Sequence, residues 1–173
     1  MGLGGRERAW IRGAQAGKVS DLEELFRRHW PLAYRAAYLV VHDAAAAEDI
    51  AQEAFLAAVR NLDRFDRRRP FAPWLHRIVV NRAIDWSRAR ALRAEAGGDA
   101  LVHAPAPEQA QLPEQVLDAI RSLSPEHRAV IVLRYLLEYT PGEIGKLLGL
   151  PRGTVNSRLR RALDALGGLL EDE

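Results

Sequence analysis

The chain contains no cysteine, and only two of its 173 residues are lysine. Without cysteine, neither a disulfide nor a thiolate metal site can form. No apolar run approaches the roughly 20 residues that a helix needs to cross a bilayer. The first residues, MGLGGRERAWIRGAQ, also lack the apolar core of a secretion signal. We therefore expect a cytoplasmic protein without membrane insertion.

Almost all of the positive charge comes from arginine. Arg accounts for 23 of the 25 basic residues, and the sequence pI is about 9.3. The guanidinium group forms planar, bidentate hydrogen bonds with phosphates and guanine edges, although high-GC coding bias also favours arginine over lysine. Residues 60–93 hold ten arginines and three acids, whereas residues 94–112 hold three acids and neither Lys nor Arg. This partition of charge along the chain is more informative than the net charge of +2.

A change in composition divides the chain. Residues 94–112, AEAGGDALVHAPAPEQAQL, are rich in Ala, Gly, Pro and Gln and show no hydrophobic periodicity, which is typical of a linker. Both flanking segments carry apolar residues at helical spacing. The run AVIVLRYLL is rich in β-branched residues, but it follows the helix start Ser124-Pro125 and has no partner strand. We predict an all-α protein with two small helical domains, 1–93 and 113–173, joined by a flexible linker, 94–112.

The C-terminal half contains the signature of a helix-turn-helix. Thr140 and Glu143 have capping-box spacing, and Pro141 lies between them at the first helical position, so we expect a short helix from Pro141 to about Leu148. Gly149 allows the left-handed turn that ends this helix, and Pro151 opens the next one. A short helix, a turn containing glycine and a longer helix define the motif.

The second helix of this motif, PRGTVNSRLRRALDAL, has two distinct faces at about 100° per residue. The predicted buried stripe is Val155, Leu159, Ala162 and Leu166. The outward face comprises Ser157, Arg160 and Arg161, with Gly153, Thr154 and Asn156 beside them. Four arginines precede the first acid, Asp164, whereas a solvated helix normally intersperses acids as i,i+4 partners. The pattern therefore favours DNA contact over a solvated face.

In the N-terminal half, the segment from Glu48 to Phe65 is predicted to be a helix. Asp49, Gln52, Glu53 and Leu56 share one of its faces, and no basic residue joins them there. Two carboxylates at this spacing could bind a metal ion, but no histidine completes the stripe. A solvated face and a docking surface for a basic partner remain open.

The loop after this helix, FDRRRPFAPW, places aromatic residues around three consecutive arginines. Proteins that bind single-stranded nucleic acid use this mixture, because bases stack on rings while positive charge holds the backbone. The helix that follows has Pro73 at its first turn, with Leu75, Val79, Ala83 and Trp86 on its core side. Arg77, Asn81, Asp85 and Arg88 lie opposite. Core packing of Trp74 and Trp86, and pairing of Asp85 with Arg82 or Arg88, are the competing interpretations.

Two blocks of the sequence resemble one family. DIAQEAF and FDRRRPFAPWLHRIVVNRAIDWSR resemble conserved region two of the extracytoplasmic-function (ECF) sigma factors of bacterial RNA polymerase, and LSPEHRAVIVLRYLLEYTPGEIGKLLGLPRGTVNSRLRRAL resembles their region four. The likeness runs from about Leu22 to Leu166. It implies a protein without enzymatic activity or cofactor that binds core polymerase, directs it to −35/−10 promoters and promotes DNA melting.

The resemblance also implies residue roles. Region two should dock on the β′ clamp helices through Asp49, Gln52, Glu53 and Phe55. The residues implied in −10 binding and melting are Phe65, Arg67, Arg68, Arg69, Phe71, Trp74, Arg77, Asn81 and Arg88. Region four should sit on the β flap and read the −35 element through Arg152, Thr154, Asn156, Ser157, Arg160 and Arg161, with Arg158 at a phosphate. Control by a separate anti-sigma factor is expected.

The sequence departs from the common family pattern at two positions. Pro151 stands where a Ser-like cap is frequent, and Asn156 stands where Arg is common, so the −35 preference does not carry over. Two other functions compete with the sigma-factor hypothesis. A free-standing helix-turn-helix repressor would need only the C-terminal half, and a nuclease using Asp49 and Glu53 would need a metal ion.

Overall fold

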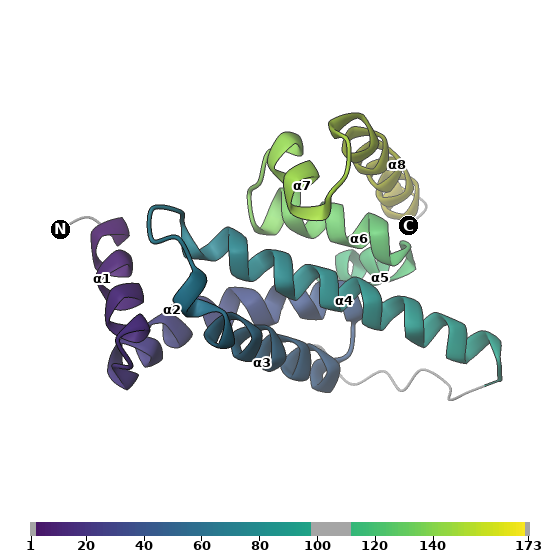
Figure 1. The fold of residues 1–173 in the computed structure, drawn as a ribbon. Helices are drawn as coiled ribbons and strands as arrows, with labels where there is room; N and C mark the ends of the chain where they lie inside the picture. The colour runs from purple at the N-terminus through teal and green to yellow at the C-terminus, as the bar shows by residue number, and fades with distance from the viewer. Residues whose placement is uncertain (1–2, 98–111, 172–173) are drawn as a thin grey trace.

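The computed structural model describes residues 3–97 and 112–171, and within them it contains helices and no strand (Figure 1). The all-α prediction is confirmed, including the helical assignment of the β-branched run. The N-terminal elements are α1 (Leu3–Gln15), α2 (Val19–Val41), α3 (Ala44–Arg60), the 3₁₀ turn η1 (Leu62–Arg64) and α4 (Phe71–Glu95). The C-terminal elements are α5 (Glu114–Ser122), α6 (Pro125–Ile131), the π-helical segment η3 (Val132–Leu136), α7 (Pro141–Leu148) and α8 (Arg152–Glu171).

Two predicted boundaries were wrong. The helix predicted from Glu48 runs instead from Ala44 to Arg60, because the side chain of Asp43 caps it by accepting a hydrogen bond from the Ala46 amide at 2.9 Å. A separate 3₁₀ turn follows it. Helix α4 continues to Glu95, two residues beyond the predicted end of the N-terminal domain at residue 93, since Ala and Glu are good helix formers. Residues 98–111 of the predicted linker lie outside the described residues.

Helix α4 crosses the middle of the molecule and contributes to two hydrophobic clusters (Figure 1). Its predicted core residues Leu75, Val79 and Ala83 are fully buried among α1–α3. Val80 and Ile84 are buried too, but in a second cluster with residues of α6, α7 and α8. The sequence predicted one buried face for this helix, and the second arises because the C-terminal domain covers it.

Polar contacts also join the two domains. His76 Nδ1 lies 2.8 Å from the Tyr139 hydroxyl, and Arg88 Nε lies 2.6 Å from a carboxylate oxygen of Glu126. Burial lowers the pKa of His76 to about 4 and raises the pKa of Tyr139 to about 12. Both groups are therefore neutral near pH 7, and their contact does not depend on pH in that range.

The helix-turn-helix forms as predicted. Glu143 Oε2 accepts from the Thr140 amide at 2.7 Å, the Glu143 amide donates back to Thr140 Oγ1 at 3.4 Å, and the capping box is complete. Gly149 ends α7 with φ 67°, in the left-handed region. A second glycine, Gly145, allows the turn to pass close to α7, because a Cβ there would lie 2.6 Å from the carbonyl oxygen of Leu150.

The substitution Gly145→Ala is expected to destabilise the C-terminal domain by about 1–3 kcal/mol, because the added methyl group overlaps a backbone oxygen. Gly142→Ala is the matched control in the same helix, since a Cβ there has no atom within 4 Å. The control should be neutral or stabilising by up to about 1 kcal/mol through helix propensity. Urea unfolding of both variants measures the difference, and equal stability would contradict the close approach.

Candidate nucleic-acid interface

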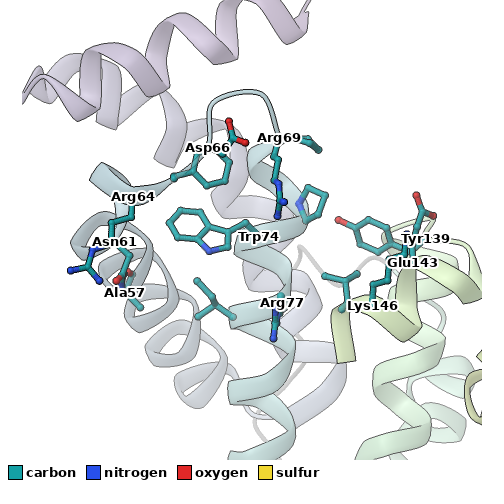
Figure 2. Close-up of a pocket in the computed structure, with 15 residues that line it drawn as sticks. Ala57, Asn61, Arg64, Asp66, Arg69, Trp74, Arg77, Tyr139, Glu143 and Lys146 are labelled. Carbon is teal, nitrogen blue, oxygen red and sulfur yellow. Dashed lines mark hydrogen bonds between the residues drawn. The ribbon is translucent and has the colours of Figure 1, made fainter. Parts of the chain in front are cut away.

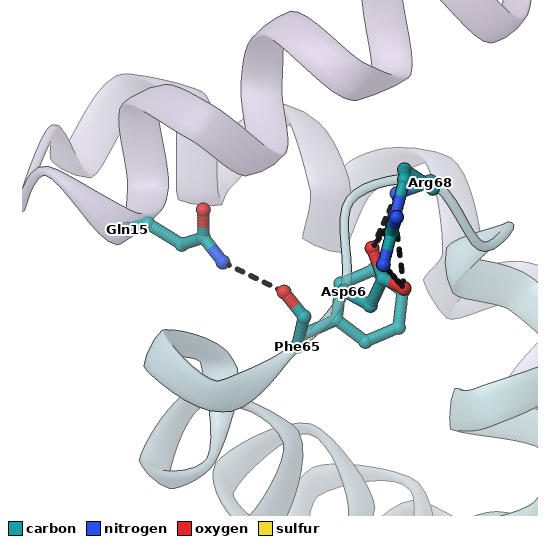
Figure 3. Close-up of polar contacts among 4 residues, drawn as sticks. All are labelled: Gln15, Phe65, Asp66 and Arg68. Atoms are coloured by element: carbon teal, nitrogen blue, oxygen red, sulfur yellow. Dashed lines mark hydrogen bonds and ion pairs between the residues drawn. The ribbon is translucent and has the colours of Figure 1, made fainter.

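The loop between η1 and α4 is organised by Asp66. The Asp66 side chain accepts from the Arg68 amide at 3.0 Å, and the Asp66 carbonyl accepts from the Arg69 amide at 2.9 Å. The Arg68 guanidinium binds the same carboxylate, with Nε–Oδ1 at 3.0 Å and Nη2–Oδ2 at 3.1 Å (Figure 3). These hydrogen bonds hold the pKa of Asp66 below its usual range. One carboxylate, that of Asp66, therefore stabilises the loop as a tight turn.

The three consecutive arginines of this loop differ in what they offer to a ligand. Arg67 and Arg69 are exposed and form no ion pair within the described residues. Arg68 instead donates to Asp66, so its charge is neutralised in this conformation. Of the three arginines predicted to contact the −10 element, Arg68 thus already has an acidic partner, two residues earlier in the chain.

The aromatic residues of the loop form a packed group. The Phe65 ring stacks on Trp74, with centroids 4.7 Å apart and an interplanar angle of 29°. The Phe71 ring meets the edges of both, at 5.8 Å and 5.7 Å. Phe71, which the sequence also assigns to −10 binding, is only 3% exposed and supports the pair from the core. Phe65 and Trp74 are half-buried and form an aromatic shelf at the surface.

A cavity of about 1000 Å³ lies beside this aromatic shelf, between the two domains (Figure 2). Trp74 and Arg77 line it from α4, and Glu143 and Lys146 line it from α7. Arg64 and Arg69 add two further cations from the N-terminal domain. Nothing in the sequence indicated that Arg64 and Lys146 lie here, because Arg64 precedes the aromatic and arginine loop and Lys146 lies on the first helix of the helix-turn-helix, in the other domain. The cavity thus combines an exposed aromatic surface with positive charge.

The polar face of α4 is partly engaged in ion pairs. Arg77 is exposed and Asn81 is half-buried. Arg88, predicted to contact DNA, binds Glu126 of the C-terminal domain. The alternative pairing of Asp85 with Arg82 or Arg88 was wrong, because Arg82 binds Glu53 at 2.6 Å and Arg88 binds Glu126.

Helix α8 presents the basic face that the angular pattern predicted. Val155 and Ala162 are fully buried, Leu159 is 8% exposed and Leu166 is half-buried, so the apolar stripe is confirmed. The exposed residues of the outward face are Arg152, Asn156, Arg160 and Arg161, and the half-buried ones are Thr154, Ser157 and Arg158. None of these arginines forms an ion pair within the described residues. The face is therefore positively charged, although Arg158 lies near enough to Glu126 to contribute to lowering the pKa of that carboxyl.

The acidic surface of α3 is less isolated than the sequence indicated. Asp49, Gln52 and Glu53 are exposed, but Glu53 is paired with Arg82 of α4. The prediction that the acids lack a basic partner was therefore wrong for Glu53, because α3 and α4 pack side by side. Phe55, predicted to take part in docking, is 5% exposed and packs on Phe26 and Trp30, with ring centroids 4.9 and 6.1 Å apart. It lines a surface hollow together with Gln52 and Leu56.

The part of the chain that the structure describes also bears on the metal-nuclease hypothesis and on membrane insertion. Across 3–97 and 112–171, no group of three or more His, Cys, Asp or Glu residues is arranged to hold a metal ion. Asp49 and Glu53 therefore lack, within that part of the chain, the further ligands that a metal nuclease would need. In the same part of the chain, no helix combines the length and apolar character needed to cross a membrane.

Comparison with known proteins identifies the class to which these two surfaces belong. The Sigma-70 region 2 family matches residues 25–93, and the Sigma-70, region 4 family matches residues 113–166. The ECF RNA polymerase sigma factor SigW of Bacillus subtilis (strain 168) is 36% identical over 155 residues, covering 80% of this chain and 83% of SigW. SigL of Mycobacterium tuberculosis (strain ATCC 25618 / H37Rv) is 33% identical over 179 residues, covering 95% and 97%.

Solved structures show the same architecture. The structure of CnrH in complex with the cytosolic domain of CnrY is similar, with a TM-score of 0.72, 29% identity and coverage of 97% of this chain and 99% of that one. The sigma factor RpoE of Bartonella quintana, solved with the anti-sigma factor NepR, has a TM-score of 0.73 over 87% of this chain and 97% of its own. At 22% identity, this second likeness concerns the fold alone.

The two matched regions define a promoter-recognition protein of the sigma-70 class. The chain belongs to the ECF subfamily of RNA polymerase sigma factors. Sigma factors bind core polymerase and are initiation factors without catalytic activity of their own, with region 2 and region 4 for promoter recognition. The predicted family, function and DNA-binding role of the helix-turn-helix are confirmed.

Proposed function

We propose that the loop of residues 65–71, called the −10 loop below, captures single-stranded non-template bases of the −10 element together with α4. A base released from the duplex would stack on the Phe65–Trp74 shelf, and Asn81 would bond its edge. Arg67, Arg69 and Arg77 would hold the neighbouring phosphates. Stacking on the aromatic rings and attraction to the arginines together offset the cost of unstacking the base, which is on the order of a few kcal/mol. The observation that carries this role is the aromatic shelf beside unpaired arginines.

For the −35 element, we propose that α8 enters the major groove with its outward face. Arg160 and Arg161 have the bidentate donors that suit guanine, and Asn156 suits adenine. Arg152, Thr154 and Ser157 would complete the contact with the element, while Arg158 would bind a phosphate. The lack of acidic partners on this face supports the proposal, because each arginine can meet DNA without first breaking an ion pair.

We propose that core polymerase is bound at two surfaces, the β′ clamp helices by α3 and the β flap by the C-terminal domain. Asp49, Gln52 and Glu53 are exposed on α3, with Phe55 supporting them from the core. When the two domains separate on the polymerase, Arg88 would break its ion pair with Glu126 and contact DNA instead. The protein would act in the cytoplasm under control by a separate anti-sigma factor; the similar CnrH was solved in complex with the cytosolic domain of another protein, CnrY, which supports a protein partner of this kind.

The substitution Asn81→Ala tests the division of labour between these surfaces. We expect core binding in a pull-down to be unchanged, because Asn81 lies on α4 and is not one of the α3 residues proposed to dock on core polymerase. Open-complex formation, measured by permanganate reactivity of −10 thymines, should fall by about fivefold or more through loss of a base contact. Gln115→Ala, an exposed amide on α5, is the control and should behave as wild type. A loss of core binding in Asn81→Ala would contradict the assignment.

A further inference from the structure

We infer that helix α1 holds both ends of the −10 loop and that Gln15 and Glu7 are positioning residues for DNA capture. This inference rests on the proposed role of the loop. Helix α1 ends before residue 25, where the match to the Sigma-70 region 2 family begins. It nevertheless reaches both ends of the −10 loop, through Gln15 at the first end and Glu7 at the second.

Gln15 fixes the first end of the −10 loop. Its Nε2 donates to the carbonyl oxygens of Leu62 at 2.9 Å and of Phe65 at 3.1 Å. Figure 3 shows the amide reaching from α1 to the Phe65 carbonyl, next to the Asp66–Arg68 turn. Both amide hydrogens of Gln15 therefore bond to backbone oxygens, and one of these oxygens belongs to Phe65, whose ring stacks on Trp74.

Glu7 fixes the second end. Its carboxylate lies 2.8 Å from His29 Nε2, and the His29 ring packs on the ring of Phe71, the first residue of α4, with centroids 5.1 Å apart. The preceding residue, Pro70, has no side chain that could cap this helix, and the nearby backbone of Phe71 contributes to lowering the pKa of Glu7. The hydrogen bond from His29 is the main cause that lowers the pKa of Glu7, which keeps the carboxylate ionised near pH 7.

Helix α1 is itself firmly placed, so it can serve as a support. Ile11 is fully buried in the core of the N-terminal domain, and Trp10 packs against that core. Gly13 lies against Asp21 of α2 so closely that a Cβ there would overlap the carboxylate. The Lys18 amide donates to the Gly13 carbonyl at 2.9 Å in the tight turn that follows. The two loop contacts are thus anchored to a rigid element.

The consequence is a preorganised loop. A site whose groups are already ordered loses less conformational entropy on binding, and its affinity is correspondingly higher. Removing the Gln15 amide leaves the core of α1 intact but frees the backbone at Phe65 and strands two carbonyl groups. Affinity for the single strand should then fall although no DNA contact is removed.

The test uses Gln15→Met, which keeps side-chain length and charge but removes both donors. Holoenzyme reconstituted with core polymerase is titrated with a single-stranded oligonucleotide carrying the −10 sequence of a start site used by the wild type. We expect fluorescence anisotropy to show affinity about five- to tenfold lower, from the loss of two hydrogen bonds. Core binding, −35 duplex binding and the melting temperature should change little. Gln115→Met is the matched control on α5.

The salt dependence of binding separates positioning from direct contact. Because Gln15 touches no phosphate in this account, Gln15→Met should leave the slope of log K against log salt unchanged. Arg69→Ala should reduce that slope by about one. Glu7→Gln, a second variant that acts at the other end of the loop, should resemble Gln15→Met.

Each other outcome has a distinct meaning. If the wild-type holoenzyme does not bind the oligonucleotide, the proposed role of the −10 loop fails. If the wild type binds and Gln15→Met binds equally well, the positioning role of α1 is overturned. A shallower salt slope in Gln15→Met would make Gln15 a DNA contact, and parallel losses of core and −35 binding would make it a general stabiliser; either result overturns the inference.

Discussion

Replacing Trp74 with alanine is expected to reduce promoter opening by about 5- to 150-fold, the equivalent of the 1–3 kcal/mol that base–aromatic stacking contributes. Trp74 is the larger member of the shelf, stacked on Phe65 at 4.7 Å, and it lines the cavity that Arg77 and Arg69 share. Without Trp74, an unpaired base loses the aromatic surface that would replace its stacking inside the duplex. Permanganate reactivity of −10 thymines with reconstituted holoenzyme measures the effect.

Trp74→Phe is the control for this prediction, because it keeps a ring at the same place and should retain most of the opening activity. The ring also packs on Phe71 in the core, so some loss of stability is expected in Trp74→Ala. Core binding and −35 duplex binding therefore need to be measured on the same preparations. If these fall as much as promoter opening does, Trp74 supports the fold and is not a base platform.

Replacing Arg160 or Arg161 with alanine is expected to cost about 1–3 kcal/mol of −35 recognition each if the side chains meet base edges. Both are exposed on α8 and neither is neutralised by an acid within the described residues. The residues are adjacent, so the double variant need not equal the sum of the single ones. Competition binding with a set of single-base −35 variants measures both affinity and specificity.

Specificity distinguishes two kinds of contact in this experiment. Loss of discrimination at one base pair identifies a base contact, whereas equal weakening on all sequences identifies a phosphate contact. Arg8→Ala removes the same charge from α1, at the opposite side of the molecule from α8 (Figure 1). This control should bind the −35 duplex like the wild type, and a comparable loss there would show that net charge, not position, determines binding.

The parts of the fold that depend on local chemistry could be predicted. Thr140, Glu143 and Gly149 specify a helix start and stop within ten residues, and the structure has both where the sequence placed them. The second buried face of α4 could not be predicted, because Val80 and Ile84 are covered by a domain distant in sequence. Periodicity reports how much of a helix is apolar but not which neighbour will cover it.

The candidate site shows the same division. The aromatic and arginine composition of the loop predicted its chemistry, and the angular pattern predicted the free face of α8. Pairing was mispredicted where the partner lies on another element, as for Glu53 with Arg82 and Arg88 with Glu126. The role of Gln15 left no signal in the sequence, since its acceptors are backbone carbonyls that any residue would provide.

Run-off transcription with purified core polymerase and genomic DNA, with and without the chain, shows whether the chain directs polymerase to promoters. We expect new transcripts that begin downstream of paired −35 and −10 elements and appear only when chain and core are both present. Trp74→Ala and the Arg160/Arg161 variants should lose these transcripts while still binding core. Absence of new start sites, together with protection of a specific duplex by the chain alone, would contradict this expectation and favour a free-standing repressor.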